Sequence, residues 1–417
     1  MAKQVFEGVK VADFSWVAAG PQIGRELADH GATVVRVESH RRPDITRQAF
    51  PFKDGKSGWN RSAYFASFNA GKYGVSLDLR TERGKQVAGK LVAWADVLTE
   101  SMMPGAMAGL GLDYESCRKV NPALIYCSTT QMGQTGPHNG YMGVGFQTNG
   151  LLGICHTTGW PDSDPTLPLT PYSDYIAPWY ALVAIIGALA RRRRTGKGMY
   201  IDQSQYEAGL HAMAPHLMDC MVNGNVISRM GNRDRYMCPH GVYPCSGGRH
   251  VAIATTTEEE WTQLCRVTGH PEWDQDPRFV TIANRKDNEG ELDGLIADWT
   301  KDLAAEEVME RLQGAGVPAG AVQRGQEVLD DPQLKHRGHY QVLHHPEIGP
   351  HSYHAPAYRL SKTPFEMKRP APCLGEHNLY VYKELLGMSD DEIAEMVIDR
   401  TITTEVDGEE AFSGGKG

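Results

Sequence analysis

One carboxylate stands apart from the other acidic side chains of this 417-residue chain. Asp174 lies in the segment Leu-Thr-Pro-Tyr-Ser-Asp-Tyr-Ile (169–176), shortly before an apolar run from Trp179 to Ala190. An Asp at this place can cap the helix that the apolar run predicts. A carboxylate in a dry pocket at a helix N-terminus also suits covalent catalysis. The spacing alone leaves both interpretations open.

Two further clusters could bind ions. The stretch from 336 to 354 holds six histidines without a cysteine among them, and their spacing fits no compact zinc site. We therefore expect a His-rich surface hairpin and no metal site. Arg191 to Arg194 could bind phosphate, but they end an apolar helix before Gly196, where cations complement the helix dipole. The capping interpretation is favoured.

A nucleotide-binding fingerprint is missing. The first predicted strand is followed by Ser15 to Gly24, which contains two glycines at the wrong spacing for Gly-x-Gly-x-x-Gly. Glu38 ends the next strand, where a ribose-binding acid could lie, but a strand-end Glu is commonly just solvated. The P-loop, the Gly-x-Ser-x-Gly elbow and the His-Glu-x-x-His helix are absent too. These motifs argue against a nicotinamide-dependent oxidoreductase.

The elements that would position Asp174 alternate between strand and helix. A strand over 9–14 leads into a helix that starts at Gly20-Pro21 and stops at Gly31, where glycine favours a helix end. Buried strands are predicted over 32–37, 74–79, 95–98 and 124–127, with a helix over 81–94. This alternation predicts an α/β fold with a parallel, doubly wound sheet.

The pattern changes near Met213. A hairpin over 241–254 and helices over 258–267, 289–299 and 304–312 indicate a smaller α+β domain. Strand-like alternation over 338–360 and a helix over 390–397 follow. We predict a large domain from 1–215 and 331–417, a small domain over 216–330, and a flexible polar tail over 401–417.

Composition narrows the functional class. The chain has 42 Lys and Arg against 51 Asp and Glu, a net charge of −9, which argues against nucleic acid as a partner. The longest apolar run is too short for a membrane span of about 20 residues, no signal peptide is evident, and the eight cysteines are scattered. We expect a cytoplasmic protein with reduced thiols and no membrane partner. The 45 Gly and 24 Pro predict many tight loops.

Short motifs follow one another in a fixed order across nearly the whole chain. They are Val-Ala-Ala-Gly-Pro (17–21), 27–32, Asn-Ala-Gly-Lys (69–72) and the strand to 79, 103–105 with 110–111, 121–126, 133–137, Arg-Arg-Thr-Gly-Lys-Gly (193–198), 316–320 and Leu-Gly-Glu-His-Asn (374–378). In this order they resemble the class III CoA-transferases, the family of formyl-CoA and carnitine CoA-transferases and α-methylacyl-CoA racemases. The segment Trp160 to Trp179 is most similar to the branch of succinyl-CoA:benzylsuccinate CoA-transferase subunits.

The resemblance implies a Rossmann-like large domain built from both chain ends, a small domain between them, and an interlaced, ring-like dimer. It aligns Asp174 with the family's nucleophile, which takes the acyl group and then CoA. Because one thioester is exchanged for another, no cofactor or metal is required. The implied substrates are an acyl-CoA donor such as succinyl-CoA and an organic acid, aromatic or dicarboxylic.

The resemblance also implies CoA contacts. Ala18 and Ala19 are expected to face the adenosine, and Lys72 aligns with a basic residue near the phosphates. Gly71 is a further expected CoA contact. Met102 and Met103 line the pantetheine channel together with Met142 and Gly143. Basic residues of some relatives are replaced here by Tyr73 and Gly109, so Arg41 or Arg42 is the substitute we consider. A further departure is Pro178, where many members have glycine.

Two alternatives remain open. A racemase of this fold needs a His before an Asp in the loop that aligns with 141–143, and Met142 cannot carry a proton. A subunit of a heteromeric transferase is the other alternative, because some relatives pair two similar chains. Both homodimer and heterodimer are therefore considered.

Overall fold

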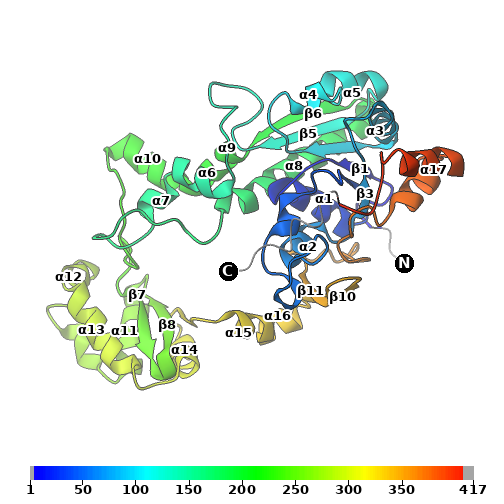
Figure 1. Ribbon diagram of the computed structural model, residues 1–417. Helices are drawn as coiled ribbons and strands as arrows, with labels where there is room; N and C mark the ends of the chain where they lie inside the picture. Colours follow the sequence, from blue (N-terminus) through cyan, green and yellow to red (C-terminus); the bar gives the residue numbers. More distant parts are fainter. Residues whose placement is uncertain (1–3, 407–417) are drawn as a thin grey trace. The chain divides into compact units, whose positions relative to one another are not determined.

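The computed structural model describes residues 4–406 and divides into two compact units (Figure 1). The first unit contains the described residues up to Ile154, 168–223 and those from Gln333 onward. The second contains Cys155–Leu167 and Gly224–Pro332. The second unit thus includes the segment 155–167, which was expected in the large domain.

A six-stranded parallel sheet forms the centre of the first unit. Its order is β3-β2-β1-β4-β5-β6, and β1 lies between β2 and β4, so that Val11 pairs with both Val34 and Val97. This is the doubly wound order, with its switch point between β1 and β4. The strands are β1 (Lys10–Asp13), β2 (Thr33–Glu38), β3 (Tyr73–Ser76), β4 (Val97–Glu100), β5 (Ile125–Thr130) and β6 (Met199–Ser204).

Helices cover both faces of this sheet (Figure 1). On one face, α1 (Ala19–Asp29) and α8 (Tyr172–Thr195) bury Ile23, Leu27 and Ile185 against the strands. On the other face lie α3 (Glu82–Trp94), α5 (Tyr114–Val120) and α17 (Asp390–Ile398), with Leu91 and Met396 in the core. The strands are buried on both sides, as expected for a parallel sheet.

Shorter elements complete the first unit. The hairpin β10 (Tyr340–His345) and β11 (Gly349–His354) packs against α2 (Ala63–Asn69) through Tyr353 and Phe65. The remaining elements are η1 (Ile45–Gln48), η2 (Lys53–Gly55), α4 (Ala106–Gly109), α6 (Gly145–Leu151), α9 (Gln205–Leu210), η3 (His211–Met213), α10 (Ala214–Asn223), α16 (Pro332–His336) and the π-helical turn η6 (Tyr380–Leu385). The short helix α7 (Ile154–Thr157) begins in this unit and continues into the second, which starts at Cys155.

The second unit is α+β. An antiparallel sheet of β7 (His240–Cys245), β8 (Arg249–Ala254) and β9 (Ala319–Ala321) packs on helices around the buried Trp261, which confirms the predicted hairpin. Its helices are η4 (Ser246–Gly248), α11 (Glu258–Thr268), η5 (Pro271–Gln275), α12 (Ile282–Asp287), α13 (Glu289–Thr300), α14 (Ala305–Gly314) and α15 (Gly325–Asp330).

The structure corrects three expectations. Strand β6 was not predicted, because it is an edge strand with polar residues and pairs only with β5. Helix α8 begins well before the predicted 179, because Pro178 lies inside it rather than ahead of it. The predicted tail does not become flexible at 401: Thr401 and Ile402 are buried, and the Thr401 carbonyl accepts a hydrogen bond from the Asp78 N–H. Residues 407–417 lie outside the described residues.

Helix α8 is long and apolar enough to cross a membrane by length and composition. Half of its most apolar window is buried, and Ala181, Ile185 and Ala188 pack on the central sheet together with α1. In this fold it is a core helix. Its last turn carries Arg192 to Arg194 and ends at Gly196 with φ 69°, as the capping interpretation predicts.

Candidate active site

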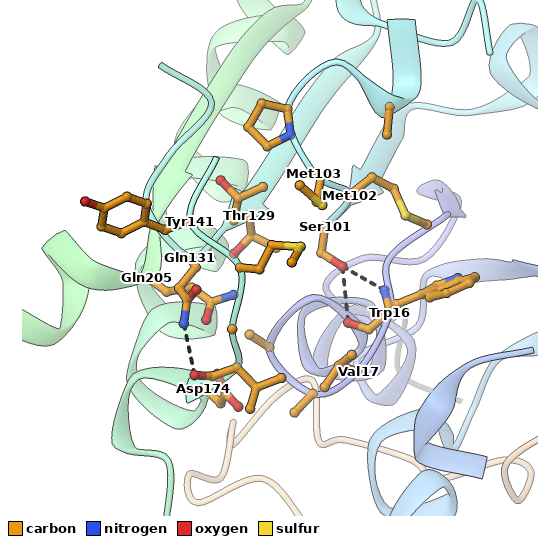
Figure 2. A pocket seen from close by; sticks show the side chains of 18 of the residues that line it. Trp16, Val17, Ser101, Met102, Met103, Thr129, Gln131, Tyr141, Asp174 and Gln205 are labelled. Carbon is orange, nitrogen blue, oxygen red and sulfur yellow. Dashed lines mark hydrogen bonds between the residues drawn. The ribbon is translucent and has the colours of Figure 1, made fainter. Parts of the chain in front are cut away.

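A cavity of about 440 Å³ opens at the carboxyl ends of β1, β4 and β5 (Figure 2). Crevices at this edge of a doubly wound sheet, beside the switch point, are where ligands bind in such folds. The cavity is lined by the segments Trp16–Ala19, Ser101–Pro104 and Thr129–Gln131, by the loop from Tyr141 to Val144, and by Arg42, Ala106, Asn139, Asp174 and Gln205.

The fold therefore gathers most of the predicted site residues around one cavity. Ala18 and Ala19 lie at its α1 side, Met102 and Met103 follow β4, and Met142 and Gly143 come from the loop before α6. Asp174 reaches the same cavity from α8 (Figure 2). Whether these residues contact CoA stays a prediction. The fold nevertheless brings Ala18 and Asp174, which are more than 150 positions apart in the sequence, to the lining of one cavity.

Asp174 is the third residue of α8 and is 6% exposed. The N-cap is Pro171, whose side chain makes no capping bond, so Asp174 is not the helix cap that the sequence allowed. Burial raises the pKa of Asp174 to about 6, and a hydrogen bond from the Gly145 backbone N–H opposes this shift. A carboxylate with this pKa is mostly ionised at neutral pH, yet poorly solvated.

Position 145 requires glycine, because its backbone lies very close to the Asp174 carboxylate. A Cβ on Gly145 would lie 2.6 Å from Asp174 Oδ1 and 2.6 Å from the Cβ of Pro171. Glycine alone therefore lets the start of α6 donate its N–H to Asp174. Four residues along α8, Pro178 has no N–H to donate to the Asp174 carbonyl, so the helix lacks that bond directly behind the carboxylate.

The structure does not place Lys72 at this cavity, so a contact of Lys72 with the CoA phosphates stays a prediction. Its side chain is fully buried, and Nζ contacts Asp13 Oδ2 at 2.8 Å, the Pro21 carbonyl at 2.7 Å and Asn69 Oδ1 at 2.9 Å. These partners use all three donors of the ammonium group. Burial lowers the pKa of Lys72 to about 8, although the Asp13 carboxylate opposes this shift. Lys72 is a structural cation of the sheet.

Gly71 likewise lies outside the cavity. It has φ 80°, and a Cβ there would approach the Cβ of Ala28 to 3.0 Å, so its role is the turn against α1. Of the two arginines considered as substitutes, Arg41 pairs with Asp78 at 2.7 Å, whereas Arg42 lines the cavity. The Arg42 guanidinium lies 5.3 Å from the Trp16 ring centre.

Sequence reasoning missed several cavity residues. Ser101, Thr129, Thr130 and Gln131 directly follow or end strands β4 and β5. The rule that ligands bind at the carboxyl ends of parallel strands could have identified them. Thr130 is 7% exposed, and its hydroxyl has no hydrogen-bond partner among the described residues.

The histidines between 336 and 354 lie on or beside β10 and β11. Among residues 4–406, no group of three His, Cys, Asp or Glu side chains is arranged to hold a metal ion. Some of these histidines are structural: His345 is buried, and the His354 ring nitrogen lies 2.9 Å from Arg25 Nη1.

Comparisons with known proteins agree with this geometry. The model of CoA-transferase family III matches residues 6–378. The chain is 31% identical to the succinyl-CoA–D-citramalate CoA-transferase of Chloroflexus aurantiacus, over 95% of this chain and 98% of that protein. It is 33% identical to the succinate–glutarate CoA-transferase of Agrobacterium fabrum, over 92% and 96%.

A solved structure shares the fold. The crystal structure of a CAIB/BAIF family protein from Brucella suis superposes with a TM-score of 0.84 at 33% identity, covering 92% of this chain and all of that one. With sequence and fold matching over nearly their whole length, the chain belongs to CoA-transferase family III and is a CoA-transferase.

Proposed function

We propose that this enzyme transfers CoA from succinyl-CoA to an organic acid, a dicarboxylate first of all, with Asp174 as the covalent nucleophile. The observation that carries this proposal is the buried Asp174 carboxylate, aligned by Gly145 and facing the cavity at the switch point of the sheet. The named relatives, which use succinyl-CoA or succinate with citramalate or glutarate, support the choice of substrates.

In the first half-reaction, an Asp174 oxygen attacks the thioester carbon of succinyl-CoA. The C–S bond breaks, leaving a succinyl–aspartyl anhydride and CoA thiolate. The thiolate then attacks the Asp174 carbonyl carbon, so that succinate leaves and an aspartyl-CoA thioester remains. Both steps exchange one acyl bond for another, so no external energy source is consumed.

In the second half-reaction, the acceptor carboxylate attacks the aspartyl-CoA thioester and releases CoA thiolate. The resulting anhydride joins Asp174 to the acceptor. Attack of the thiolate on the acceptor's acyl carbon gives the new acyl-CoA and regenerates the Asp174 carboxylate. Water must be excluded during both halves, because it would hydrolyse the anhydride.

The cavity offers groups for both substrates. We assign Arg42 to the CoA phosphates, since it lines the cavity whereas Lys72 is buried in an ion pair with Asp13. Met102 and Met103 provide an apolar wall for the pantetheine arm. The unpartnered Thr130 hydroxyl is suited to donate to a carboxylate or carbonyl oxygen of the acyl group.

A second candidate is that the active species pairs two chains, either identical or homologous. Exposed apolar side chains gather on α8 and α10: Val183 is 71% exposed, Met221 79% and Val222 71%. Such patches mark protein–protein contacts. A relative that is 29% identical over 95% of this chain is named as the beta subunit of a succinyl-CoA–L-malate CoA-transferase, also from Chloroflexus aurantiacus.

One experiment tests the function. The purified chain is incubated with succinyl-CoA and a panel of dicarboxylic and aromatic acids, then treated with hydroxylamine, and the modified peptide is mapped by mass. We expect new acyl-CoA and an adduct on Asp174, both abolished in D174A. Full transfer by D174A would refute the mechanism, whereas activity that appears only with a second homologous chain would establish the heteromer.

A further inference from the structure

The turn between β1 and α1 carries a backbone conformation that its residue disfavours. Val17 has φ 68°, and among the described residues only Asp54 and Arg400 are other non-glycine residues with positive φ. For a β-branched residue the left-handed region is strained, at a cost of about 1–3 kcal/mol. Val17 lines the cavity, and so do its neighbours Trp16 and Ala18.

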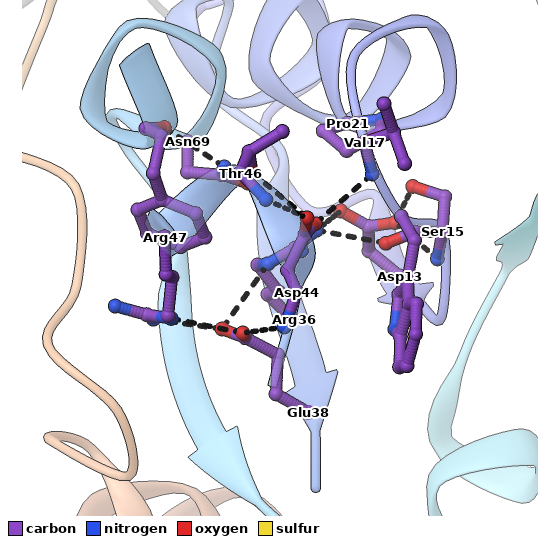
Figure 3. Close-up of polar contacts among 12 residues, drawn as sticks. Asp13, Ser15, Val17, Pro21, Arg36, Glu38, Asp44, Thr46, Arg47 and Asn69 are labelled. Atoms are coloured by element: carbon purple, nitrogen blue, oxygen red, sulfur yellow. Dashed lines mark hydrogen bonds and ion pairs between the residues drawn. The ribbon is translucent and has the colours of Figure 1, made fainter. Parts of the chain in front are cut away.

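Hydrogen bonds fix the backbone of this turn at Val17 and at Trp16. The Val17 N–H donates to Asp44 Oδ2 at 3.0 Å (Figure 3). One residue earlier, the Trp16 N–H donates to Ser101 Oγ at 2.8 Å, and the Ser101 hydroxyl donates to the Trp16 carbonyl at 3.1 Å (Figure 2). The backbone around Val17 therefore has little freedom to return to negative φ.

Ser15 anchors the start of the turn. Its N–H donates to Asp13 Oδ1 at 3.0 Å, and its carbonyl accepts from Arg36 Nη1 at 2.9 Å. The Asp13 carboxylate is in turn neutralised by the buried Lys72 at 2.8 Å. Lys72 therefore stabilises the carboxylate that anchors this turn and does not itself reach the substrate cavity.

The Asp44 carboxylate is itself immobile. Its Oδ2 also accepts from Arg36 Nη2, and its Oδ1 accepts from the N–H and the hydroxyl of Thr46 at 2.9 and 2.8 Å. The Asp44 N–H donates to Glu38 Oε1 at 3.1 Å (Figure 3). Asp44 and Arg36 are fully buried. A buried, fully bonded carboxylate can impose a strained conformation on its donor.

We propose that Asp44 and Ser101 are positioning residues that hold Val17 in the left-handed conformation and so fix the Trp16–Ala19 wall of the cavity for acyl-CoA binding. This rests on the proposed function. Without these acceptors, Val17 relaxes to negative φ, and the side chains before and after it move relative to Asp174. Because this wall would bind acyl-CoA in the ground state as well as in the transition state, its displacement should raise the KM, and the expected loss in kcat/KM for acyl-CoA is about 10- to 100-fold.

The test compares D44N with T46V. Thr46 bonds the same carboxylate through the opposite oxygen, so T46V removes a bond to Asp44 but leaves the acceptor of Val17. We expect D44N to raise the KM for acyl-CoA far more than it lowers kcat, and T46V to change kcat/KM less than about threefold. Free CoA, titrated by calorimetry, gives the binding change without any chemistry.

The V17G background separates positioning from a general loss of structure. Glycine adopts φ 68° without strain, so the effect of D44N on acyl-CoA KM and on CoA affinity should be at least about fivefold smaller in V17G than beside Val17. If D44N does not fold, S101A takes its place, and its effect on acyl-CoA KM and on CoA affinity is likewise compared between the Val17 and V17G backgrounds. Equal effects in both backgrounds, or equal effects of D44N and T46V, would overturn the proposal.

The two proposals fail differently. If the wild-type protein binds CoA and the D44N effect depends on residue 17, but no acid accepts CoA, the proposed substrates are wrong and the positioning role stands. If the wild-type protein transfers CoA but D44N behaves like T46V, only the positioning role is wrong. Failure of the wild-type protein to bind CoA contradicts both.

Discussion

Replacing Asp174 with asparagine should stabilise the protein while abolishing transfer. Burial raises the pKa of Asp174 from 3.8 to about 6, and each tenfold change in acidity corresponds to about 1.4 kcal/mol. Keeping this carboxylate ionised in the folded state therefore costs about 3 kcal/mol above pH 6. Asparagine keeps the shape and an oxygen for the Gly145 N–H, but it carries no charge.

The sign and the pH range follow from the two pKa values. Between pH 3.8 and about 6 the unfolded chain has lost the Asp174 proton while the folded protein keeps it, so stability falls as pH rises. The cost is about 1.5 kcal/mol at pH 5 and about 3 kcal/mol at pH 7.5. The buried asparagine amide, if unbonded, removes about 1 kcal/mol of the gain at both pH values.

Urea unfolding of D174N and wild type at pH 7.5 and pH 5.0 measures this difference. We expect D174N to be more stable by about 2 kcal/mol at pH 7.5, and the advantage to shrink by about 1.5 kcal/mol at pH 5.0. The matched control is D390N, an exposed first-turn aspartate of α17, whose effect should stay within about 0.5 kcal/mol and be destabilising.

A pH-independent difference, or a destabilised D174N at pH 7.5, would refute the argument that ionised Asp174 destabilises the folded protein because it is buried.

The same pKa predicts how kcat/KM depends on pH. Because the nucleophile must be ionised, kcat/KM should fall about tenfold per pH unit below pH 6 and level off above it. A profile that is flat between pH 5 and 7 would contradict the assigned role.

Three further substitutions test the site. G145A places a methyl group against the Asp174 carboxylate, so transfer should fall more than about tenfold while a circular dichroism spectrum stays native. R42A should raise the KM for acyl-CoA and weaken its salt dependence, whereas R41A, which loses a bond to Asp78 outside the cavity, should not. K72M leaves Asp13 buried without its ammonium partner and should lower the unfolding free energy by about 3–5 kcal/mol in urea titrations.

The sequence by itself determined the fold class and most of its elements. Strands such as 97–100 and helices such as 82–94 have local periodicity and end signals, which do not depend on distant contacts. It also marked Asp174 as a candidate, because its neighbours are mostly apolar or aromatic, but it left open whether this carboxylate caps a helix or acts as a nucleophile. The family resemblance then supplied the chemistry that the spacing left open.

Only the tertiary structure decided which residues meet. Lys72 and Arg42 are both cations in loops beside strands: Arg42 follows β2, and Lys72 directly precedes β3. No local pattern tells which of the two reaches the cavity. Burial beside Asp13 removes Lys72 from the solvent, and the turn after β2 leaves Arg42 at the cavity. The same is true of Asp44 and Val17: their hydrogen bond joins the loops that follow the neighbouring parallel strands β1 and β2, and a left-handed valine has no sequence signal. Local patterns specify elements, whereas charge pairing and backbone strain depend on what the fold brings together.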